Sequence, residues 1–234
     1  MKRIICITIL LSVAITNVFG QLPENVKKHY CNTFEVFTDL ITAKPENFTP
    51  KAINMGYSFS ISYLVPVGKS DFSFSIGGGM TWHNFYSDAL PKDAIPADLW
   101  SDSWNDYYFM KLDSLGVASY TKNKICVAYF GVPVELFYCA KNGIRFTVGM
   151  RLDFKVGSNT KYNGTDFLYG TTEVYKYKKY NLQNLSNFGL SPVVRFGWRW
   201  FNVYASYSLI SVYEASAGNK IRPISLGISF TPGR

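Results

Sequence analysis

The stretch IRFTVGMRLDFKV, residues 144–156, alternates between apolar side chains and polar or small ones at every position. A period of two is that of a β-strand, whose successive side chains point to opposite faces. The apolar residues share one face, and Arg145, Arg151, Asp153 and Lys155 lie on the other. In a soluble protein the apolar face meets a core, whereas in a membrane barrel it meets lipid and the charged face lines the interior.

The same alternation recurs along the chain, so the sequence predicts eight strands. Those outside 144–156 are 34–41, 52–67, 71–84, 124–138, 188–198, 201–209 and 224–230. In 124–138 the apolar phase changes by one residue near Gly131–Pro133, and a β-bulge there explains the change.

The connections between these strands alternate between longer and shorter ones. The shorter ones carry turn residues, including Gly68 and the dipeptide Asn142-Gly143, which is a strong hairpin signal. Outer membrane barrels have long loops outside and short turns on the periplasmic side. The sequence therefore predicts two long external loops, at about 85–123 and 157–186.

Volume, composition and length place the apolar face on the outside. The interior of an eight-stranded barrel is just wide enough for side chains to fill it, so the many aromatic rings of the apolar rows do not fit there. Three of the opposite rows hold almost only Ser and Gly, which suit a narrow interior. Residues 144–156 give roughly 43 Å of strand, or about 30 Å of height at a 45° tilt, which matches a bilayer core.

The interior is expected to hold a polar network that fills the barrel, because charges in a narrow, poorly hydrated space need partners. The residues expected in this network are Arg145, Arg151, Asp153, Lys155, Arg195, Glu135 and His83, with Glu35 and Asp39 as further candidates. Aromatic belts mark the two boundaries of a membrane barrel. We expect Tyr63 and Trp198 in the periplasmic belt, and Trp82 and Tyr207 in the outer one.

The N-terminus reads as a secretory signal peptide over 1–20, with Lys2 and Arg3 before an apolar run and small residues before Gln21. We expect a periplasmic N-terminal segment at 21–32 and the barrel at 33–231. No later segment approaches eighteen unbroken apolar residues, so a membrane-embedded chain would have to cross as strands.

The sequence gives little indication of nucleic-acid binding, catalysis or metal binding. The net charge is +8, but the basic residues form no long run, which disfavours nucleic acid as a partner. Only His29 and His83 are available for acid–base catalysis, and His83 lies on the face of its strand that is expected to point into the barrel. Cys31, Cys126 and Cys139 lack zinc-site spacing and are expected to be free, buried thiols. We therefore predict no enzyme, no catalytic residue, no metal and no cofactor.

Several segments resemble the small outer membrane β-barrel family, PorT-like or OmpX-like, of Bacteroidota-type Gram-negative bacteria. They are the signal peptide, AYFGVPVELFY at 128–138, FTVGMRLDFKVG at 146–157 and the closing ISLGISF at 224–230. The resemblance implies an outer membrane location, insertion by the barrel assembly machinery and no catalytic residue. Family barrels tend to end on their final aromatic residue, whereas here Thr231 and three further residues follow Phe230.

The sequence thus predicts an all-β protein, an eight-stranded antiparallel up-and-down transmembrane barrel. The expected role is non-enzymatic, in envelope structure or surface interaction, with outer membrane lipids, lipopolysaccharide and an envelope protein as candidate partners. Three alternatives stay open: an accessory subunit of an envelope or secretion complex, a membrane-embedded lipid-modifying enzyme, and a soluble periplasmic lipocalin-like carrier.

Overall fold

The computed structural model describes residues 29–96, 108–168, 171, 173–214 and 220–232. The expected signal peptide, most of the expected segment 21–32 and the middle of the expected loop 85–123 lie outside this part. Within it, no helix has the length and the apolar character needed to cross a bilayer.

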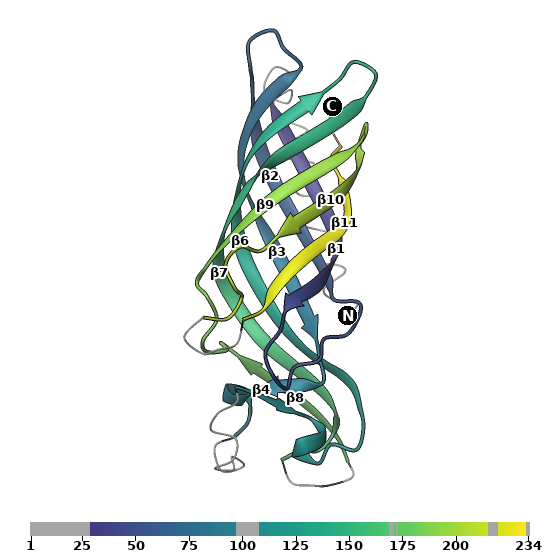
Figure 1. Ribbon diagram of the computed structural model, residues 1–234, viewed down its shortest axis with the longest axis vertical. Helices are drawn as coiled ribbons and strands as arrows, with labels where there is room; N and C mark the ends of the chain where they lie inside the picture. The colour runs from purple at the N-terminus through teal and green to yellow at the C-terminus, as the bar shows by residue number, and fades with distance from the viewer. Residues whose placement is uncertain (1–28, 97–107, 169–170, 172, 215–219, 233–234) are drawn as a thin grey trace, which may run out of the picture.

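Eight antiparallel strands close into a barrel (Figure 1). They are β1 (Tyr30–Ala43), β2 (Met55–Pro66), β3 (Phe72–Tyr86), β6 (Tyr120–Cys139), β7 (Ile144–Thr165), β9 (Phe188–Trp198), β10 (Phe201–Tyr207) and β11 (Arg222–Phe230). Each pairs with the next in this series, and Phe34 of β1 lies opposite Phe230 of β11, which closes the ring. The predicted all-β, eight-stranded antiparallel barrel is confirmed. Its first strand begins at Tyr30, four residues before the expected start at Phe34.

Short turns join β2 to β3, β6 to β7, and β9 to β10, and Figure 1 shows them at one end of the barrel. The β6–β7 turn depends on Gly143, whose φ of 89° suits glycine. A Cβ at this position would lie 2.9 Å from Nε1 of Trp198, so the close packing of this indole also requires glycine.

The other end of the barrel carries a sheet that extends past the ring of strands (Figure 1). β8 (Val174–Tyr180) pairs with the outer part of β7, from Asn159 to Thr165. The expected loop at 157–186 is therefore largely strand. We call β8, the part of β7 that pairs with it and the part of β6 on the other side of β7 the projecting sheet. Two short strands, β4 (Ala89–Pro91) and β5 (Phe109–Lys111), form a separate ribbon, with 3-10 turns at Lys92–Ala94 and Asp113–Leu115.

The predicted bulge near Gly131–Pro133 is wrong. Pairing of β3 with β6 has the same register on both sides of this segment, from Phe72 opposite Tyr138 to Ile76 opposite Val134 and from Gly79 opposite Gly131 to Tyr86 opposite Lys124. The nearest register shift lies in the pairing of β6 with β7 instead. Tyr129 pairs with Lys155 and Ala128 with Gly157, so Val156 of β7 is the extra residue.

The apolar phase change in β6 has a different cause, which is a change of surroundings along an unbroken strand. Val132 and Val134 point outward, whereas Ile125, Val127 and Tyr129 point inward and are buried. These three inward residues belong to an apolar cluster that closes the end of the barrel from which the projecting sheet extends. We call this end the outer end. The other buried members of the cluster are Phe48, Phe85, Ala89, Ala94, Phe109, Leu182, Leu185, Val212, Tyr213 and Ile221.

Large apolar side chains cover the outside of the barrel. Phe146 is 41% exposed, Leu152 45% and Leu226 42%, far above the values of a core residue. Among the outward side chains of the eight strands, the only charged ones are Lys122, Lys124, Lys161 and Arg222, all toward the projecting end. The barrel therefore carries an uncharged apolar band around its full circumference.

Candidate functional site

Arg195 of β9 lies at the middle of the lumen between two carboxylates from different strands. Its Nε donates to Oε1 of Glu35 on β1 (2.7 Å), and its Nη1 donates to Oε1 of Glu135 on β6 (2.7 Å). All three side chains are buried. Charge-assisted bonds of this kind are the condition under which a buried guanidinium is tolerated.

A second arginine extends this network toward the outer end. Nε of Arg151 lies 3.0 Å from Oδ1 and 3.1 Å from Oδ2 of Asp153, and its Nη1 lies 3.9 Å from Oε2 of Glu35. The same guanidinium donates to the hydroxyl of Tyr204 (3.4 Å), which in turn donates to Ser206 (2.8 Å). Glu35 is therefore shared between the two arginines.

The remaining predicted lumen residues point inward as well, but bond to other partners. Arg145, near the short turns, donates to the carbonyl and the hydroxyl oxygen of Thr231 (3.1 and 3.0 Å). Lys155 donates to the carbonyl of Leu185 (2.9 Å) beside the bulge. The first residue after the final aromatic thus has a structural role, since Thr231 anchors Arg145.

His83 lies nearer the outer end, where its Nδ1 donates to Oδ2 of Asp39 (2.8 Å). The second oxygen of this carboxylate accepts a hydrogen bond from Ser225 (2.6 Å). The carboxylate therefore separates the serine from the imidazole, and Ser225 is not placed for activation by His83. A catalytic serine would instead donate to the histidine.

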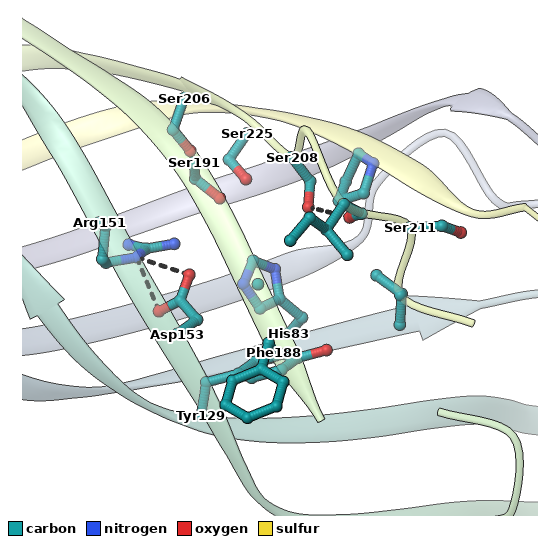
Figure 2. A pocket seen from close by; sticks show the side chains of 14 residues that line it. His83, Tyr129, Arg151, Asp153, Phe188, Ser191, Ser206, Ser208, Ser211 and Ser225 are labelled. Atoms are coloured by element: carbon teal, nitrogen blue, oxygen red, sulfur yellow. Dashed lines mark hydrogen bonds and ion pairs between the residues drawn. The ribbon is translucent and has the colours of Figure 1, made fainter. Parts of the chain in front are cut away.

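Three small cavities follow one another along the lumen, of about 20, 10 and 10 Å³. Figure 2 shows the largest, where Arg151 and Asp153 lie beside His83. Space of this size holds about one water molecule. Arg151 lines the outer and middle cavities, and Arg195 lines the middle and inner ones, so the two guanidinium groups separate them.

The sequence missed Tyr204, Ser225 and Thr231, which bond to predicted members of the lumen network. For the first two, a signal was present. Tyr204 and Ser225 share the inward parity of their strands with other polar residues, and alternation alone places them inside. Thr231 lies beyond the last strand, where alternation carries no information.

The four predicted belt residues all point outward. Tyr63 is 41% and Trp198 56% exposed, and the indole of Trp198 donates to the carbonyl of Asn142 in a short turn (3.0 Å). Trp82 stacks on Tyr57 at the other boundary of the band, with ring centres 5.2 Å apart. Tyr207 is the last residue of β10.

Five lysines gather on the outward face of the projecting sheet, and we call this the lysine face. It consists of Lys122 and Lys124 on β6, Lys161 on β7, and Lys176 and Lys178 on β8. Lys124 pairs directly with Lys161, and Lys161 with Lys178, so three like charges form one row across three strands. Direct opposition of like charges in a sheet is destabilising. The sequence did not reveal this face, because its members come from three distant segments.

The three cysteines of the described chain are free but only partly buried, so the expectation of buried thiols is wrong in that respect. Cys126, for example, lies on the outward face of β6. No group of three or more His, Cys, Asp or Glu side chains that could hold a metal ion is found in the residues that the structure covers.

No protein-family model matches the chain, and no curated protein matches it with significance. Solved structures of Ail, the attachment invasion locus protein of Yersinia pestis, are similar over 87% of this chain and 97–98% of theirs. The identity is 9% with a TM-score of 0.39 for Ail alone, and 10% with 0.38 for its complex with the heparin analogue sucrose octasulfate. Ail in a phospholipid bilayer nanodisc gives 11% and 0.33. Likeness at this level identifies neither a family nor a function, and the narrower PorT-like assignment gains no support from it.

Proposed function

We propose that this chain is an outer membrane β-barrel protein with a filled lumen, which holds a sheet and its associated loops at the cell surface as an interaction platform. The observation that carries the proposal is the uncharged apolar band. A ring of exposed Phe, Leu, Ile and Val without a charged side chain is unfavourable in water and is what a lipid-facing surface requires. The exported N-terminus, the PorT-like resemblance and insertion by the barrel assembly machinery belong to the same proposal.

The filled lumen supports a role that involves no transport. Arg151 and Arg195 occupy the axis between cavities of one water each, and the apolar cluster around Phe85 and Tyr213 covers the outer mouth. A carrier of the lipocalin kind needs an internal pocket of several hundred Å³. The alternative of a soluble carrier is therefore disfavoured by lumen volume as well as by the apolar exterior.

We also propose that the protein is not an enzyme. His83 faces a cavity of about 20 Å³, which has no space for a lipid substrate. Its hydrogen bond goes to Asp39, and the nearby Ser225 donates to that carboxylate and not to the imidazole. Replacement of His83 by Ala should leave the lipid A of the host unchanged when measured by mass spectrometry.

Two measurements test the barrel and its closed lumen together. After cell fractionation the protein should be in the outer membrane and should migrate faster on a gel when unheated than after boiling, because closed barrels resist unfolding by detergent. In planar bilayers the purified protein should show conductance far below that of a general porin. Carbonate extraction of the protein without detergent would contradict the membrane assignment, and a porin-sized conductance would contradict the filled lumen.

A further inference from the structure

We propose that the lysine face binds the phosphate groups of glycolipid headgroups in the outer leaflet of the membrane. This inference rests on the proposed function, since it requires the apolar band to be embedded in the outer membrane. It assigns a ligand class to one defined surface of the projecting sheet. Arrangement, lack of neutralising partners and height above the band each support it.

The arrangement concentrates positive charge within a small area. Lys124, Lys161 and Lys178 are cross-strand neighbours, and neighbouring strands are about 4.8 Å apart, so the row spans roughly 10 Å. Lys122 and Lys176 flank Asn163 in a second row two residues further along the strands, about 7 Å away. The five lysine positions thus lie within an area of roughly 10 by 7 Å, which is wide enough for one or two phosphate groups.

The charges of the lysine face have no acidic partner in the described chain. None of the ion pairs between described residues involves one of these five lysines. Lys124 donates to the side-chain oxygen of Asn84, and Lys178 donates to the hydroxyl of Tyr180 (2.6 Å), but neither bond neutralises a charge. Burial, together with the like charges of Lys122, Lys161 and Lys178, lowers the pKa of Lys124. An anion at this surface would remove the repulsion.

The height of the row matches the headgroup region. Trp82 in the expected outer belt lies opposite Ala128, and Ala128 lies opposite Gly157 at the bulge. Lys124 follows four residues beyond Ala128 along β6, about 13 Å of strand or roughly 9 Å of height at a 45° tilt. The lysines therefore lie where phosphorylated sugars of an outer-leaflet glycolipid begin, and this position favours a membrane lipid over a soluble anion.

The test uses the exposed members of the face, so that the fold is preserved. The triple variant Lys161→Gln/Lys176→Gln/Lys178→Gln removes three charges, and the matched control Lys44→Gln/Lys69→Gln/Lys141→Gln removes three from outside this face. Binding of the purified barrels to bisphosphorylated and to dephosphorylated lipid A is measured in mixed detergent micelles. Heat-modifiable gel mobility confirms that each barrel is closed.

We expect the wild type and the control to bind bisphosphorylated lipid A, and the triple variant to bind it about 100-fold more weakly, given about fivefold for each of the three lysines near an anionic surface. Dephosphorylated lipid A should bind all three proteins equally and weakly. Equal binding of phosphorylated lipid by the triple variant and the wild type would overturn the proposal. Binding of heparin and of inorganic phosphate, two soluble anions, is measured in the same way. If either binds as tightly as lipid A, the proposal that the ligand is a membrane lipid is overturned. Loss of heat-modifiable mobility in the wild type would instead contradict the barrel assignment.

Discussion

Replacing Arg195 by Met should lower the free energy of unfolding by about 3–5 kcal/mol, the usual cost of leaving a buried charge without its partner. Glu135 has no ion pair with another described side chain, whereas Glu35 stays 3.9 Å from Arg151. The uncompensated charge in this variant is therefore mainly that of Glu135. Urea unfolding of the barrel in lipid vesicles, followed by tryptophan fluorescence, measures the change.

The double variant Arg195→Met/Glu135→Gln separates pairing from packing. It removes the stranded carboxylate together with the guanidinium, and replacing a whole buried ion pair is often nearly neutral. We expect it to regain more than half of the stability lost in the single variant. If the single variant unfolds at the same urea concentration as the wild type, the lumen network does not stabilise the barrel.

Replacing Met150 by Arg should destabilise the inserted barrel by about 2–4 kcal/mol, the cost of a cation at the midplane of a bilayer. Met150 is 37% exposed and lies halfway along the apolar face of 144–156. Reversible folding into vesicles of defined lipid measures the difference.

Val174→Arg is the matched control, because Val174 is 71% exposed but lies on β8, away from the apolar band. This variant should fold with wild-type stability. Equal stability of the Met150 variant would show that the apolar face does not meet the hydrocarbon core.

Alternation along the sequence was sufficient to predict the eight barrel strands and the direction of their side chains. It placed Arg195, Glu135 and Glu35 inside, and the register then brought them together. Which alternate residues of a strand point inward is a local property, so it can be predicted from that segment alone, without knowledge of the strands beside it. This is why the closed barrel and most of its lumen were predictable.

The errors arose where a pattern depends on surroundings that are distant in sequence. Inward residues of β6 change from polar to apolar near Tyr129 because loop residues such as Phe109 and Tyr213 pack there. From sequence alone, that change cannot be distinguished from a shift of phase. Tyr175 and Tyr177 alternate with lysines, a strand pattern that the expected loop at 157–186 overlooked, and the pairing of β8 with β7 and the resulting lysine row appear only in the register.

Site-directed spin labelling decides whether the apolar band faces lipid. Single cysteines at Phe146 and Leu226 are labelled in a background where Cys31, Cys126 and Cys139 are replaced by Ser, and a third label at Lys176 reports the projecting sheet. In bilayers, labels at 146 and 226 should collide with dissolved oxygen far more often than with a water-soluble nickel complex, and the label at 176 should show the reverse. Frequent nickel collisions at 146 and 226, or immobilisation of both labels by packed protein, would contradict the membrane barrel.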